Sequence, residues 1–194
     1  MVILSGVNTE YLLYVLLGIG LAAACGFRVF VPFLVISIAA LTGHLRLAPD
    51  FAWLGSWPAL IVFGVATALE ITAYCIPWLD HLLDVAATPA AIIAGIIVTA
   101  SVVTGMSPIL RWTLATIAGG GIAAAVQLAT VAMRRASTYA TAGLAHPLAA
   151  TVETGGSVGM SALSLLLPFV AGFLAILFIL LSARWLLRRR ARQP

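Results

Sequence analysis

The chain has 194 residues, of which 63% are hydrophobic and only 8% are charged, and its mean hydropathy is +1.16. An ordinary soluble domain is about one quarter charged, so this composition excludes a soluble fold for almost the whole chain. The net charge of +4 reflects ten basic residues, all of them arginine, and half of them lie in the last eleven residues.

Apolar sequence fills most of the chain in five stretches. One helical crossing of a bilayer needs about 20 apolar residues, so the chain has enough for five or six crossings and too little left for a separate soluble domain. We therefore predict an all-α bundle of transmembrane helices, with residues 1–187 as one transmembrane domain and residues 188–194 as a basic cytoplasmic tail. The first ten residues carry no arginine, so no cleavable signal peptide is expected. The stretches cover residues 11–45, 57–76, 89–105, 109–133 and 158–187.

The first stretch is too long for one straight crossing. Its 35 residues would span about 50 Å at about 1.5 Å per residue, and Gly26, Arg28 and Pro32 interrupt it near the middle. It is either one strongly tilted, broken helix or two short segments folded as a hairpin. Both are permitted where irregular backbone is buried in protein or lines a wet cavity.

The arginine tail predicts which side of the membrane each connection faces. Arginine is retained on the cytoplasmic side, so we expect a multi-pass protein of the cell's inner membrane with a cytoplasmic C-terminus. Arg46 and Arg111 agree with this orientation, whereas Arg134 and Arg135 fall on the outer side. Counting back from the tail places residues 136–157 outside, 105–108 inside, 77–88 outside and 43–56 inside.

Glycine and alanine recur at helical spacing, for example at Gly20 and Ala24 and at Gly121 and Ala125. Small residues let membrane helices approach closely, which predicts a compact bundle and allows a homo-oligomer. The segments that begin at Gly20 and Gly121 also resemble each other, which fits either an inverted repeat or a shared composition alone.

Ionisable groups inside a span are costly and usually face a bundle interior or a wet cavity. Arg28 lies at the break of the first stretch, where it can receive an anionic group or neutralise Glu70. Asp80, His81 and Asp84 share one face of a short helix, because they are spaced by three and four residues. Together with Glu70 they suit either a cation site or a proton relay, or they only cap and solvate that helix.

A second group of polar residues surrounds the stretch 136–157. Ser137, Thr138 and His146 belong to a segment rich in hydroxyl groups and glycine, which we predict to form a re-entrant or surface loop. Glu153 either pairs with Arg134 or Arg135 or lies near a solute pathway.

Motifs for other functions are missing from the sequence. It contains no nucleophile elbow, no HExxH, no phosphate-binding glycine loop and no cysteine and histidine spacing of a zinc site. Cys25 and Cys75 are isolated in apolar surroundings and are expected only to pack. We therefore expect neither an enzyme nor a cofactor. We also expect no nucleic-acid partner, because the basic tail directly follows an apolar span.

Three blocks together resemble a known family: residues 20–32 (GLAAACGFRVFVP), residues 76–84 (IPWLDHLLD) preceded by Glu70 and followed by Thr88-Pro89, and residues 137–147 (STYATAGLAHP). They are similar to the domain-of-unknown-function family 4126, a group of small bacterial multi-pass membrane proteins, over about residues 18–168. The resemblance implies the fold and points to Arg28, Glu70, Asp80 and Asp84, and it carries no activity. The chain departs from the family pattern at Tyr74-Cys75, Ala142, His146 and Thr154.

The sequence favours a small membrane transporter or channel-like protein for an ion or small solute, with the bilayer as its surroundings. Two alternatives belong to other classes: a non-transporting scaffold or assembly partner, and a lipid-modifying enzyme that uses His81 with Asp80 or Asp84. A cavity that reaches both Arg28 and Glu70 favours transport, whereas a closed bundle with every charge in a direct pair favours the scaffold.

Overall fold

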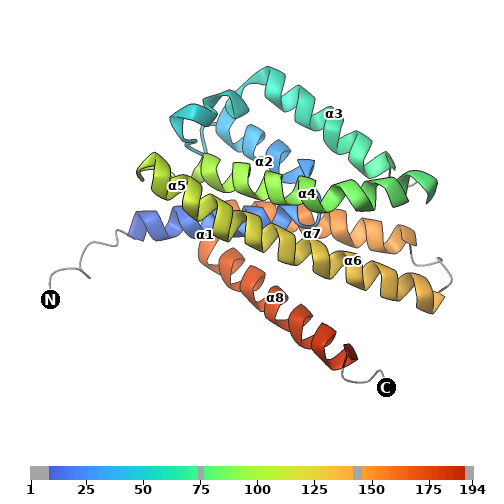
Figure 1. Ribbon diagram of the computed structural model, residues 1–194. Helices are drawn as coiled ribbons and strands as arrows, with labels where there is room; N and C mark the ends of the chain where they lie inside the picture. Colours follow the sequence, from blue (N-terminus) through green and yellow to red (C-terminus); the bar gives the residue numbers. More distant parts are fainter. Residues whose placement is uncertain (1–8, 74–76, 142–145, 191–194) are drawn as a thin grey trace, which may run out of the picture.

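The computed structural model describes residues 9–73, 77–141 and 146–190, and all regular secondary structure in these ranges is helical. The predicted all-α class is therefore confirmed. In chain order (Figure 1), the elements are α1 (Thr9–Cys25), α2 (Phe30–Leu41), the 3-10 helix η1 (Pro49–Gly55), α3 (Trp57–Ala73), α4 (Pro77–Val102), α5 (Pro108–Leu114), the π-helical turn η2 (Ala115–Gly120), α6 (Gly121–Thr141), α7 (His146–Leu166) and α8 (Pro168–Arg190).

Two helical segments of the described chain are long and apolar enough to cross a membrane alone, Pro108–Ala136 and Pro168–Trp185. The pair Pro49–Gly55 and Trp57–Ala73 adds a third if the two helices, bent by 66°, form one span. Helix length and composition thus support two or three crossings, and the expected five or six are not confirmed.

The first apolar stretch is broken, as predicted, and it forms two helices that fold back on each other. α1 ends at Cys25, and α2 begins at Phe30 and returns toward the end of the bundle where α1 starts (Figure 1). Pro32 fits the first turn of α2, where its missing N–H would have no helical partner. Gly26 is needed at the break because a methyl group there would lie 2.6 Å from Cβ of Val126 in α6.

α1 is the centre of the bundle. It contacts α2, α4, α6, α7 and α8, and its residues 21–25 have almost no exposed surface. Small residues bring the backbones together: the Thr99 hydroxyl of α4 donates to the Gly18 carbonyl of α1 at 3.2 Å, and Gly95 of α4 faces Gly119 of the π-helical turn. Close backbone approach supplies van der Waals contact where lipid offers no hydrophobic driving force.

The stretch 136–157 was expected to be a re-entrant or surface loop, and this expectation is wrong for its described residues. Residues 136–141 continue α6 and residues 146–157 belong to α7. Hydroxyl groups are compatible with this helix because they bond to carbonyls: Thr154 donates to Ala150 at 2.9 Å, and Ser157 donates to Ala24 of α1 at 2.9 Å.

A second break divides the last apolar stretch between two helices. The stretch 158–187 was predicted to be one span, but α7 ends at Leu166 and α8 begins at Pro168, which cannot donate a helical hydrogen bond. α8 then runs back toward the end of the bundle where α6 and α7 meet (Figure 1). The C-terminal end of α8 therefore lies toward the end of the bundle where α6 ends and α7 begins, and away from residues 105–108. α8 also continues to Arg190, past the boundary expected at residue 187.

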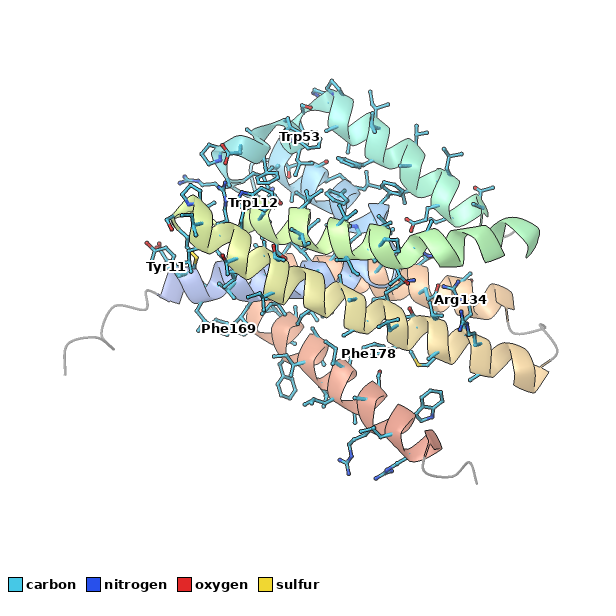
Figure 2. All side chains as sticks on the ribbon, viewed as in Figure 1. Tyr11, Trp53, Trp112, Arg134, Phe169 and Phe178 are labelled. Carbon is cyan, nitrogen blue, oxygen red and sulfur yellow. The ribbon has the colours of Figure 1, made fainter. Side chains whose placement is uncertain are left out.

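Aromatic side chains mark the other end of the bundle. Figure 2 shows Tyr11, Trp53 and Trp112 at the end where α1 and α5 begin, and 55% of Trp53 and 43% of Trp112 are exposed. Next to them, Arg111 of α5 forms an ion pair with Asp50 of η1. Tryptophan and tyrosine are enriched where a membrane meets water, so this end has the composition of a membrane interface.

Candidate functional site

Two arginines and two glutamates from four parts of the chain meet near the break of the first apolar stretch. Arg28 lies between α1 and α2, Glu70 lies on α3, Arg134 on α6 and Glu153 on α7. Arg28 is 1% exposed, Arg134 7% and Glu153 6%, whereas Glu70 is partly exposed. We call these four residues the charge cluster.

Arg134 and Glu153 form the tightest ion pair of the charge cluster. Nη2 of Arg134 lies 2.8 and 2.7 Å from the two carboxylate oxygens of Glu153, and Nε lies 3.1 Å from Oε1. This multiple contact uses the planar geometry of the guanidinium group and fixes α6 against α7. Figure 2 shows Arg134 on the part of α6 that lies beside α7.

Glu153 is shared with a second arginine. Nη2 of Arg28 lies 3.8 Å from Oε2 of Glu153 and donates a 3.1 Å hydrogen bond to the carbonyl of Ala150, one turn earlier on α7. The break between α1 and α2 is thereby tied to α7. Glu153 thus contacts two guanidinium groups at once.

Glu70 caps a helix that lies far away in the sequence. Its carboxylate accepts hydrogen bonds from the backbone N–H groups of Val29 at 2.8 Å and Phe30 at 3.0 Å, the first amides of α2. The N-cap position of α2 is Val29, whose side chain offers no hydrogen bond. A carboxylate at this position satisfies free amides and interacts favourably with the positive end of the helix dipole.

Arg28 and Glu153 both lie close enough to Glu70 for their charges to act on its carboxylate. This arrangement can exchange a proton at Glu70, or bind another anion at the start of α2 when that carboxylate leaves.

An apolar cleft of about 480 Å³ lies on the other side of Phe27, the neighbour of Arg28. Its walls come from α1, α6, α7, α8 and the break after α1, and none of the charge cluster residues lines it. The Phe27 ring packs against Phe178 of α8, with 5.4 Å between the ring centroids. Phe27 of the cleft and Arg28 of the charge cluster are thus adjacent in the chain.

The structure brings together four of the residues singled out in the sequence: Arg28, Glu70, Arg134 and Glu153. Glu153 pairs with Arg134 rather than with the exposed Arg135. The remaining candidates are on helices, but their side chains lie outside the part of the structure that is described. Among described residues, no group of three histidine, cysteine, aspartate or glutamate residues is placed to hold a metal ion. These remaining candidates are Asp80, His81 and Asp84 in the first turns of α4, Ser137 and Thr138 near the end of α6, and His146 at the start of α7.

Sequence reasoning missed the backbone partners of the charge cluster and the residues of the cleft. Val29 and Phe30 take part through their N–H groups, which no side-chain pattern reveals. Gly155 and Gly159 line the cleft, and their spacing of four residues on one helix face is the signal that would have found them.

Comparison with known proteins places the chain in one family. The family model described as "Domain of unknown function (DUF4126)" matches residues 15–189, nearly the whole chain. Neither a curated protein nor a solved structure matches it. The chain is therefore a member of the DUF4126 family, which agrees with the resemblance found in its sequence.

Proposed function

We propose that the chain is a small membrane protein that passes an ion or small solute, with the charge cluster as its gate. The observation that carries this proposal is the carboxylate of Glu70 on the amides of Val29 and Phe30. Broken helices whose N-termini receive an anion near the middle of the membrane are a recurring feature of transporter binding sites. In the closed bundle, the carboxylate of Glu70 occupies the anion position at the N-terminus of α2. Protonation or displacement of this carboxylate opens the position.

The energetic cost of the charge cluster supports this reading. Replacing a buried ion pair with apolar residues of similar size is often neutral or stabilising, so stability alone does not require these charges. Arg28, Arg134 and Glu153 are nevertheless all buried within an apolar bundle. Ionisable residues in such positions commonly belong to ion or proton pathways.

We further infer a multi-pass protein with five crossings and one re-entrant pair, which counts α4 and α7 as crossings by their length alone. At about 1.5 Å per residue, the 26 residues of α4 and the 21 of α7 are about 39 and 32 Å long, enough to cross a hydrocarbon core of about 30 Å. With α3, the continuous α5–α6 rod and α8 they make five crossings, and α1 with the 12-residue α2 enters and returns.

The ends of this bundle differ in charge, which supports an orientation. Arg135 lies in the C-terminal part of α6, and Arg184 and Arg188 lie near the end of α8, so they share one end of the bundle. Arg111 lies in α5, toward the other end, where it is paired with Asp50. The conflict expected between Arg135 and the tail therefore disappears. The excess of arginine at the tail end supports a cytoplasmic C-terminus in the cell's inner membrane.

The test is flux through liposomes that contain the purified full-length protein. Proton, cation and anion fluxes are measured with a panel of salts for the wild type and for Glu70→Gln, which keeps the side-chain shape and removes the charge. Glu10→Gln is the matched control, because Glu10 is exposed at the start of α1. We expect wild-type flux for at least one ion, a change of tenfold or more in Glu70→Gln, and no change in Glu10→Gln. Absence of flux for every ion in folded wild type would overturn the proposal.

One observation favours a second candidate, a non-transporting scaffold or assembly partner. The charges of the cluster are in direct contact with one another or with backbone groups, and the neighbouring cleft is lined by apolar residues. In a scaffold, these contacts only fix α1, α2, α6 and α7 relative to one another. Flux that is absent in wild type, together with loss of stability in Glu70→Gln, is the result expected for this candidate.

A further inference from the structure

The cleft beside Phe27 is apolar along all of its walls. At about 480 Å³ it is within the range of roughly 300–1,000 Å³ that is common for small-molecule sites. Every lining residue is either apolar or glycine. Ala23, Phe27 and Val126 form the inner wall, and the side walls come from α7 and α8.

α7 and α8 supply most of the lining residues of the cleft, and exposed residues of these two helices form its mouth. Toward its C-terminal end α8 diverges from the rest of the bundle (Figure 1). Gly155 and Gly159 of α7 have open space where a side chain would begin, and both are exposed. On the opposite wall, 40% of Leu174 and 56% of Leu181 are exposed. Since an apolar mouth within a bilayer meets hydrocarbon rather than water, the natural filling of this cleft is an acyl chain.

The cleft-lining face of α8 continues into two arginines. Leu174, Leu177 and Leu181 line the cleft and are spaced by three and four residues, so they lie in one row along the helix. Arg184 and Arg188 follow Leu181 by three and seven residues in the same row, and both are exposed. An apolar slot therefore leads to a pair of accessible guanidinium groups near the end of α8.

We propose that this cleft binds one acyl chain of an anionic phospholipid whose phosphate is held by Arg184 and Arg188. The row on α8 matches both parts of such a lipid, because guanidinium groups bind phosphate strongly and leucine side chains pack against hydrocarbon. A second copy of the chain fits less well. A symmetric dimer through this face would bring the arginines of two α8 helices together, and like charges repel.

The test is native mass spectrometry of the delipidated full-length protein after addition of dioleoyl phosphatidylglycerol or dioleoyl phosphatidylcholine. The two lipids have the same acyl chains and differ in headgroup charge. We expect one tightly bound phosphatidylglycerol per chain and roughly tenfold weaker binding of phosphatidylcholine, since each arginine near a membrane surface contributes measurably to the binding of anionic lipid.

Two sets of variants separate the two parts of the site. Gly159→Leu adds a side chain to the wall of the cleft at a position where its Cβ meets no atom within 4 Å, and it should lower binding of both lipids about tenfold. Gly155→Leu repeats the test from one turn away. Gly121→Leu is the matched control, because Gly121 also has open space but is outside the cleft. The double variant Arg184→Gln with Arg188→Gln should reduce phosphatidylglycerol binding to the level of phosphatidylcholine, whereas Arg46→Gln should not.

Three results would overturn the proposal. The first is unchanged lipid binding in both Gly155→Leu and Gly159→Leu, with elution and unfolding temperature as in the wild type. The second is a preference for phosphatidylglycerol that survives removal of Arg184 and Arg188. The third is a wild-type dimer that Gly159→Leu dissociates, which would assign the cleft to a second copy.

Discussion

Arg134 and Glu153 meet in the interior of the bundle through contacts of 2.7, 2.8 and 3.1 Å, and Arg28 approaches the same carboxylate from the other side at 3.8 Å. One acidic side chain thus contacts two buried cations that come from opposite halves of the sequence. Removing either partner of the Arg134–Glu153 pair leaves a different charge behind.

The first prediction concerns this asymmetry. Glu153→Gln leaves two buried arginines without their carboxylate and should lower the free energy of unfolding by roughly 3–5 kcal/mol. Arg134→Gln should cost less, because Glu153 can still pair with Arg28. Denaturant unfolding in detergent measures both. Arg135→Gln, at the exposed neighbouring position, should change stability by no more than about 0.5 kcal/mol. Equal losses in Glu153→Gln and Arg134→Gln would contradict the shared-carboxylate arrangement.

The second prediction concerns the cap on α2. Glu70→Gln retains one acceptor oxygen but loses the charge that interacts with the amides of Val29 and Phe30. We expect a loss of about 1 kcal/mol in local stability and faster hydrogen exchange in the peptide that covers residues 26–33. Mass spectrometry after exchange in detergent measures this, with Glu10→Gln as the control. Unchanged exchange in that peptide would show that the carboxylate does not stabilise the start of α2.

The third prediction compares two glycines that are two residues apart. A methyl group at Gly119 would lie 2.5 Å from the Gly95 carbonyl oxygen, whereas one at Gly121 meets nothing within 4 Å. Gly119→Ala should therefore destabilise the protein by about 1–3 kcal/mol through overpacking. Gly121→Ala should be neutral or stabilising by up to about 1 kcal/mol, since alanine favours a helix. Thermal unfolding measures the stability of the two variants. Destabilisation by both substitutions would refute close packing as the cause.

The fourth prediction concerns the side of the membrane on which the connections lie. In a background with Cys25→Ala and Cys75→Ala, single cysteines are introduced by Arg135→Cys, Arg188→Cys and Arg46→Cys. An impermeant maleimide applied to cells and to inverted vesicles reports the side of each. Arg135→Cys and Arg188→Cys should label from the same side, and Arg46→Cys from the opposite one. Labelling of the first two from opposite sides would mean that α7 and α8 together make a single crossing.

Much of the fold was predictable because it depends on local features of the sequence. The low charge and high hydropathy predict the all-helical class, since backbone groups in hydrocarbon must be satisfied within the chain. Gly26 and Pro32 mark the break in the first stretch, and the structure has it there. By contrast, the hydroxyl-rich stretch 136–157 has the composition of a loop and is helical where it is described, because Thr154 and Ser157 bond to helix carbonyls.

The sequence by itself determined that this protein is all-helical, with apolar helices that could span a membrane and a broken first region, and it identified the few charged residues inside its apolar stretches. Only the tertiary structure decided that Glu70 caps α2, that Glu153 serves both Arg28 and Arg134, and that α7 and α8 frame an apolar cleft. The physical reason is that lipid is as apolar as leucine. Hydrophobicity therefore marks a membrane helix without marking the face that it turns to its neighbours.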